Sequence, residues 1–117
     1  MNSRGFTRVE FSECASVLLD DDVIFGDLKN VSLKGMFLQT SHNIPLNTEV
    51  VVKVYDSNNS SISVQGLVVR NEKSGIGIQI LKLDVDSFVR LRNLIIIKCN
   101  NYNMIMKETY KMSNCIH

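Results

Sequence analysis

The sequence has no tryptophan and a single proline, and its charges nearly cancel, with 13 lysine and arginine residues against 12 aspartate and glutamate residues. A net charge of +1 gives no global electrostatic reason to bind DNA, RNA or an anionic membrane. A single-strand-binding surface needs exposed aromatic side chains, whereas the phenylalanines fall in core-like patterns at Phe11, Phe25, Phe37 and Phe88. Binding of an anion must therefore come from a local group of cations.

Cysteines and long apolar runs are also scarce. Cys14, Cys99 and Cys115 are widely spaced and form no CxxC pair, so neither a disulfide framework nor a zinc site is expected. The longest apolar run, residues 94–97, is far too short to span a bilayer, and the first residues lack the apolar stretch of a secretory signal. We therefore expect a cytoplasmic protein with reduced thiols, no membrane insertion and no bound metal.

The residue groupings of common catalytic sites are missing. His42 and His117 are far apart in the sequence, and the cysteines have no evident base beside them. Residues 20–22 are three adjacent aspartates, which predict a solvated turn because a calcium loop needs alternating ligands. No glycine-rich phosphate loop precedes a helix. We expect a protein that is not an enzyme and has no cofactor.

Short apolar or alternating segments separated by turn residues occupy most of the chain. They predict six strands, at residues 7–19, 23–28, 36–40, 49–55, 62–70 and 76–81. The connections are too short for parallel crossovers, so the pattern favours an antiparallel barrel or sandwich. Small residues at 14–16 interrupt the first alternation and indicate a bulge or bend there.

The pattern becomes helical from Asp84. Asp84 or Asp86 can cap a helix, and apolar residues then follow at helical spacing, one face of which would close one end of the barrel. We assign residues 1–98 to one domain, with residues 99–117 as a tail or helix extension. A long helix would present a seam through which the chain could form a homo-oligomer, made of Phe88, Leu91, Ile95, Cys99, Tyr102 and Met106. The alternative is a loosely packed tail.

Two stretches carry residues suited to a small anionic ligand. Arg4 and Arg8 offer guanidinium forks that match two phosphate oxygens or the Hoogsteen edge of guanine. Asn30 can both donate and accept hydrogen bonds, Ser32 adds a hydroxyl, and Gly35 allows close backbone approach. If this stretch is extended, Asn30 and Ser32 point to the same face. Together the two stretches predict a two-part binding site.

These stretches resemble the motifs of the PilZ domain family. Residues 4–9 look like its RxxxR motif, and residues 30–35 match its [D/N]xSxxG motif in full. Residues 66–70 and 75–80 are similar to its late strand pair. The resemblance covers residues 4–98 and includes the C-terminal helix. It implies an all-β domain, a six-stranded antiparallel β-barrel, with that helix at its C-terminus.

The resemblance also implies a function. PilZ domains bind cyclic di-GMP, a bacterial second messenger, so this chain is expected to be a bacterial receptor for that nucleotide. The RxxxR arm would wrap the ligand, the [D/N]xSxxG segment would form the barrel side of the site, and an arginine near a strand end would add a contact. The implied ligand-binding residues are Arg4, Arg8, Asn30, Ser32, Gly35 and Arg70.

Three matters stay open at this point. Gly5 stands where family members often have a further arginine, which leaves the affinity open and leaves the ligand as either a single molecule or an intercalated dimer. The alternative function is a PilZ-like adaptor that contacts proteins and does not bind the nucleotide. The sequence does not identify the downstream partner. It also does not indicate whether the downstream process is motility, polysaccharide synthesis or virulence.

Overall fold

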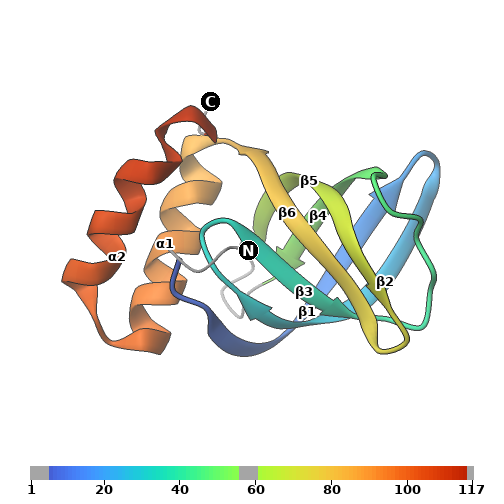
Figure 1. Ribbon diagram of the computed structural model, residues 1–117, viewed down its shortest axis with the longest axis horizontal. Helices are drawn as coiled ribbons and strands as arrows, with labels where there is room; N and C mark the ends of the chain where they lie inside the picture. Colours follow the sequence, from blue (N-terminus) through green and yellow to red (C-terminus); the bar gives the residue numbers. More distant parts are fainter. Residues whose placement is uncertain (1–5, 56–60, 116–117) are drawn as a thin grey trace.

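The computed structural model describes residues 6–55 and 61–115, and the side chains of these residues as far as residue 112. Figure 1 shows a barrel of strands with helices packed against one end. The strands are β1 (Val9–Leu19), β2 (Asp22–Val31), β3 (Gly35–Gln39), β4 (Glu49–Tyr55), β5 (Ser61–Glu72) and β6 (Gly75–Leu83).

All neighbouring strands are antiparallel, and the barrel closes in the order β1-β2-β3-β6-β5-β4. Alternation of burial explains the closure: in β4, Val50, Val52 and Val54 point into the core, while Lys53 and Tyr55 between and beyond them are exposed. A closed barrel leaves no unpaired sheet edge. The expected six-stranded antiparallel β-barrel is confirmed.

The irregularity of β1 lies earlier than expected. The register between β1 and β2 shifts between Glu10 and Glu13, whereas residues 14–16 pair regularly with β2. Ala15 is fully buried and lies opposite Gly26, and a Cβ on Gly26 would come within 2.6 Å of the Gln39 carbonyl oxygen on β3, so small residues occur here without a bulge. The predicted bulge at residues 14–16 is therefore wrong in position.

The C-terminal region contains two α-helices rather than one. α1 (Val85–Cys99) begins after Asp84, whose carboxylate accepts a 2.7 Å hydrogen bond from the Ser87 amide. It ends at Asn100, which adopts the left-handed conformation with φ of 55°. Asn101 then caps α2 (Tyr102–Thr109) by accepting a 3.1 Å hydrogen bond from the Met104 amide. The predicted long helix and its seam are therefore wrong, because adjacent asparagines end one helix and begin the next.

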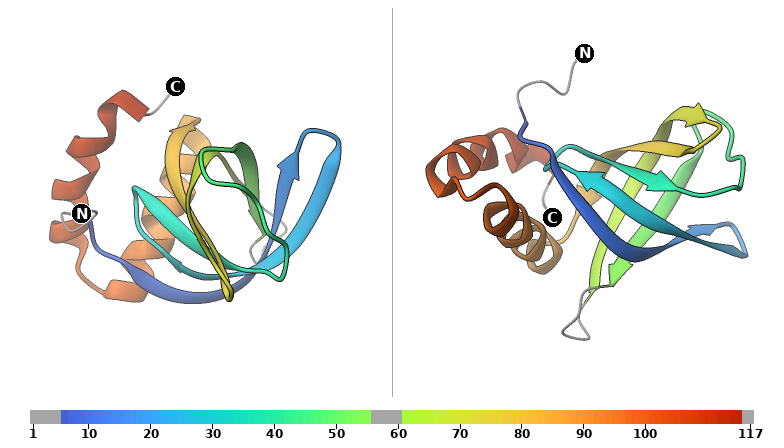
Figure 2. Two further views of the ribbon diagram at one scale, coloured as in Figure 1. Left: turned by 45° about the vertical axis from the view of Figure 1, so that its right-hand side comes forward. Right: turned by 90° about the horizontal axis from the view of Figure 1, so that it is seen from below.

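The tail packs against the rest of the domain. α2 is followed by a 3₁₀ helix, η2 (Tyr110–Cys115), and both Ile105 and Met112 are fully buried. α1 contributes Phe88, Leu91 and Ile95 to the same core. Both views in Figure 2 place α1 and α2 side by side at one end of the barrel. The expectation of a loosely packed tail is also wrong.

Within residues 6–55 and 61–115, no helix combines the length and the apolar character needed to cross a membrane. Over the same part of the chain, no cluster of three or more histidine, cysteine, aspartate or glutamate side chains could hold a metal ion.

Candidate functional site

The strand register sets predicted site residues on one outward-facing row of the barrel. Glu10 of β1 lies opposite Asn30 of β2, Asn30 opposite Phe37 of β3, Phe37 opposite Gly77 of β6, and Gly77 opposite Arg70 of β5. Residues that are directly opposite on neighbouring strands share a face of the sheet. Asn30 and Arg70, which are distant in sequence, therefore belong to one surface.

Arg70 lies flat across this surface because Gly77 has no side chain. A Cβ built on Gly77 would come within 3.0 Å of the Arg70 Cβ and 3.4 Å of its Nε. The Arg70 guanidinium reaches over β6 to the Phe37 ring, 5.4 Å from its centroid, and its Nε donates to a Glu72 carboxylate oxygen at 3.0 Å. The Arg70 side chain stays 60% exposed, so its remaining donors can meet a ligand.

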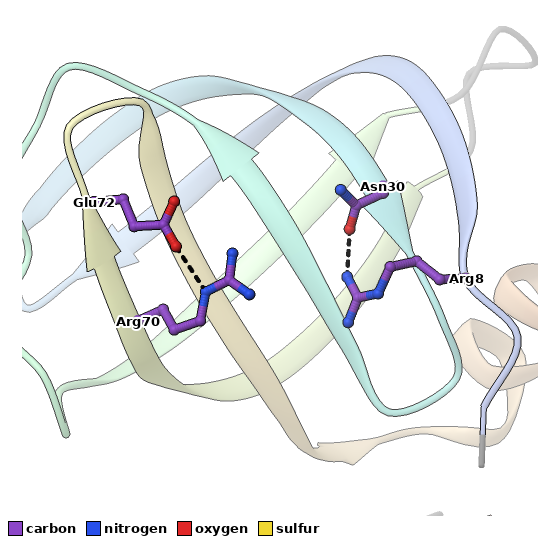
Figure 3. Close-up of polar contacts among 4 residues, drawn as sticks. All are labelled: Arg8, Asn30, Arg70 and Glu72. Atoms are coloured by element: carbon purple, nitrogen blue, oxygen red, sulfur yellow. Dashed lines mark hydrogen bonds and ion pairs between the residues drawn. The ribbon is translucent and has the colours of Figure 1, made fainter. Parts of the chain in front are cut away.

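Arg8 approaches the same surface from the residue before β1. Its Nη1 donates a hydrogen bond to the Asn30 side-chain oxygen, as the close-up in Figure 3 shows. Gly35 lies beside this guanidinium, since a Cβ there would be in ordinary contact with Arg8 Nη2 at 3.8 Å, while its tight contact, at 3.0 Å, would be with the Ile78 carbonyl oxygen. Partial burial, and after it the positive charge of Arg70, lowers the pKa of Arg8 from its usual high value. The two guanidinium groups therefore lie close enough for their positive charges to interact.

Ser32 has a different position from Asn30. Its side chain is 1% exposed, and its hydroxyl oxygen accepts hydrogen bonds from the Gly35 amide at 3.1 Å and the Lys34 amide at 3.2 Å. The Ser32 amide donates to the Gly35 carbonyl at 2.8 Å, which closes the turn between β2 and β3. The stretch is thus not extended through Ser32, and Asn30 and Ser32 do not share an exposed face.

The sequence of this barrel matches a known protein family. The PilZ domain family matches residues 2–96, which is most of the chain. The chain belongs to the PilZ domain family. No curated protein sequence matches it.

Solved structures similar to this PilZ domain share its fold at low sequence identity. The PilZ domain of Escherichia coli YcgR with c-di-GMP matches with a TM-score of 0.69 at 11% identity, over 85% of this chain and 93% of that one. The PilZ domain of CeSA from a cellulose-synthesizing bacterium matches with a TM-score of 0.61 at 14% identity, over 77% and 95%.

A larger protein shares the same fold over part of its length. The Bacillus subtilis inhibitor of motility, MotI/DgrA, matches with a TM-score of 0.73 at 12% identity, over 86% of this chain. This chain spans about half of that protein, 53% of its length.

The structure brings together Arg8, Asn30, Gly35 and Arg70, whereas Ser32 is buried and bonds within the β2–β3 turn. Arg4 lies outside the described residues. In Figure 3 the guanidinium groups of Arg8 and Arg70 lie on the same side of the sheet. Two cations, a side-chain amide and an aromatic ring on one open face can bind a ligand that combines phosphate with a planar base.

Sequence reasoning missed two residues of this surface. Phe37 is only half-buried and faces outward beside Arg70, although its pattern had indicated the core. Gly77 opens the space that Arg70 occupies. A glycine inside a strand can mark a close approach, which is the one signal that could have pointed to Gly77. Phe25 is also misassigned, since it is 63% exposed, whereas Phe11 and Phe88 are buried as expected.

Proposed function

We propose that this PilZ domain is a receptor for cyclic di-GMP. The observation that carries the proposal is the convergence of Arg8 and Arg70 on one outward face. The two positive charges repel each other, and a phosphate bound between them would be attracted by both. Cyclic di-GMP has two phosphate charges and two guanine bases. Guanidinium forks match phosphate oxygens and the Hoogsteen edge of guanine.

Each predicted site residue has a proposed role. Arg4 and Arg8 would bind phosphate and guanine from the N-terminal arm, and Asn30 would orient Arg8 and offer its amide to the ligand. Arg70 would face the second side of the ligand from β5. Ser32 and Gly35 would support the site by shaping the β2–β3 turn, where Gly35 also allows close approach to the Ile78 carbonyl of β6.

Membership of the PilZ family and the fold shared with the YcgR PilZ domain with c-di-GMP support this proposal at the level of a ligand class. We propose further that the protein acts in the bacterial cytoplasm, that it is a receptor and not an enzyme, and that it signals through a ligand-induced change in conformation or in protein contacts. The ligand is either a single molecule or an intercalated dimer, and the stoichiometry of binding distinguishes the two.

Isothermal titration calorimetry with cyclic di-GMP tests the proposal and gives the stoichiometry. Truncating a cation that pairs with a bound phosphate costs about 2–5 kcal/mol, so Arg8→Ala should abolish measurable binding or weaken it severely. Arg90→Ala is the matched control, because Arg90 lies on α1 and its Nη1 donates to the Ser61 carbonyl at the opposite end of β5 from Arg70. Equal affinity of wild type and Arg8→Ala would refute the role of Arg8.

An adaptor that acts only through protein contacts is the second candidate. The specific observation in its favour is the fold shared with the inhibitor of motility from Bacillus subtilis. Thermal unfolding separates the two: a ligand at 100 times its dissociation constant adds about 2.7 kcal/mol to the free energy of unfolding. A clear rise in melting temperature with cyclic di-GMP supports the receptor, and an unchanged melting temperature at millimolar nucleotide supports the adaptor.

A further inference from the structure

The residues just before Arg8 are attached to the C-terminal helix. The backbone amide of Thr7 donates to Glu108 Oε1 at 2.8 Å, and the Thr7 hydroxyl donates to Glu108 Oε2 at 2.6 Å. Both carboxylate oxygens are therefore used by one residue. Glu108 belongs to α2 and is only 6% exposed, so these hydrogen bonds satisfy a carboxylate that burial would otherwise destabilise.

A second contact holds the same segment from η2. Lys111 Nζ lies 5.6 Å from the centroid of the Phe6 ring, and Phe6 is partly buried against the core. We call residues 6–8 the strap. Phe6 and Thr7 in the strap thus contact the C-terminal helices, while Arg8 at its end bonds to Asn30 on the barrel. One short segment connects α2 to the candidate site.

We propose that Glu108 is a positioning residue for the ligand site: by holding Thr7 it keeps the strap in place, so that Arg8 lies against Asn30 before ligand arrives. This inference rests on the proposed function and deepens it. Without the Glu108 contacts, the strap would sample other positions, and only the fraction with Arg8 in place would bind. The apparent dissociation constant rises in inverse proportion to that fraction.

Linkage makes the effect reciprocal. If packing of α2 through Glu108 favours ligand binding, bound ligand must favour the packing of α2 by the same factor. The α2–η2 surface would then report ligand occupancy, although it supplies none of the candidate site residues Arg8, Asn30, Gly35 and Arg70. This assigns α2, which the sequence had left as an undefined tail, to the response of the receptor.

Two substitutions at one position separate hydrogen bonding from packing. Glu108→Leu keeps a side chain of similar size and removes both acceptors. Glu108→Gln keeps an oxygen for the Thr7 amide and an NH₂ group that can donate to the Thr7 hydroxyl. Ile105→Val is the matched control, since Ile105 is fully buried in the same helix and takes no part in the hydrogen bonds between Glu108 and Thr7. Should Glu108→Leu not fold, Thr7→Val removes the hydroxyl bond alone and is expected to show a smaller change of the same sign.

The first measurement requires no ligand. NMR relaxation of the Arg8 Nε–H group reports the order of the guanidinium. We expect it to be ordered in wild type, Glu108→Gln and Ile105→Val, and disordered in Glu108→Leu together with loss of Thr7 amide protection from exchange. An Arg8 signal that stays ordered in Glu108→Leu after Thr7 protection is lost would overturn the proposal.

The second measurement is calorimetry with cyclic di-GMP. If the competent fraction falls to about one fifth, Glu108→Leu binds about five-fold more weakly, with Glu108→Gln and Ile105→Val close to wild type. Bound ligand should raise exchange protection of α2 amides in wild type. Tighter binding by Glu108→Leu would mean that the contact opposes the ligand, and would overturn the proposal. Absence of binding by wild type would refute the receptor function, and the Arg8 relaxation result would then decide the role of Glu108 alone.

Discussion

Arg70 on β5 lies directly over Gly77 on β6, and the space that a side chain would fill at Gly77 is the space through which Arg70 reaches Phe37. The absence of a Cβ thus determines the path of a cation across the barrel surface. This relationship connects a glycine that contacts no ligand to the electrostatics of the site.

Gly77→Ala should weaken cyclic di-GMP binding by displacing Arg70. The added Cβ would come within 3.0 Å of the Arg70 Cβ and 3.4 Å of its Nε, so the Arg70 side chain must shift by a few tenths of an ångström from its path over β6. We expect about a ten-fold loss in affinity, equivalent to one lost hydrogen bond to a charged group. In the Arg70→Ala background the same substitution should have almost no further effect, and calorimetry on all four proteins measures this. Additive losses would show that Gly77 acts independently of Arg70.

Glu72→Gln should strengthen binding of the nucleotide. The Glu72 carboxylate pairs with Arg70 Nε at 3.0 Å and adds negative charge beside an anion site. An exposed pair of this kind is worth about 0–1 kcal/mol, so the gain in affinity is about two- to five-fold at low salt and smaller at high salt. Asp21→Asn makes the same change in charge at the far end of the β1–β2 hairpin and should leave affinity unchanged. A weaker Glu72→Gln complex would show that the carboxylate positions Arg70 rather than competing for it.

Ser32→Ala should reduce stability more than it reduces binding. The buried hydroxyl accepts from the Gly35 and Lys34 amides, and its removal leaves these donors without that acceptor inside the turn. The expected cost is about 1–3 kcal/mol in the free energy of unfolding, measured by urea denaturation. Ser63→Ala on β5 provides a control for serine truncation in a strand. A loss of affinity as large as that of Arg8→Ala, with stability unchanged, would instead place the Ser32 hydroxyl on the ligand.

Binding and stability should both be insensitive to Arg8 titration at neutral pH. Burial and Arg70 lower the pKa of Arg8 in the folded state, so its protonated form destabilises the fold, and that penalty is relieved only as pH rises through the lowered pKa. An arginine stays charged in proteins throughout the physiological range, so the interval lies above it. Calorimetry from pH 6 to pH 9 should therefore give a constant affinity, and a marked fall across this range would implicate another titrating group.

Much of the fold follows from local patterns. Alternation in β4 predicts a half-buried strand, because each inward-facing valine is separated from the next inward-facing valine by one residue that faces outward. The end of α1 was harder to predict. Apolar residues continue the helical spacing beyond Cys99, and only the left-handed conformation of Asn100 and the cap at Asn101 stop it.

The sequence by itself determined the strands, their antiparallel arrangement and the two motifs, since these depend on periodicity, turn residues and spacing along the chain. The periodicity left a barrel and a sandwich equally open, and the resemblance to the PilZ family implied the barrel. Tertiary structure alone decided that Arg70 crosses Gly77 to Phe37, that Ser32 is buried in the β2–β3 turn, and that Glu108 holds Thr7. Strand register and helix packing bring these groups together from distant parts of the chain. Such proximity is set by the shape of the whole core, which no local pattern contains.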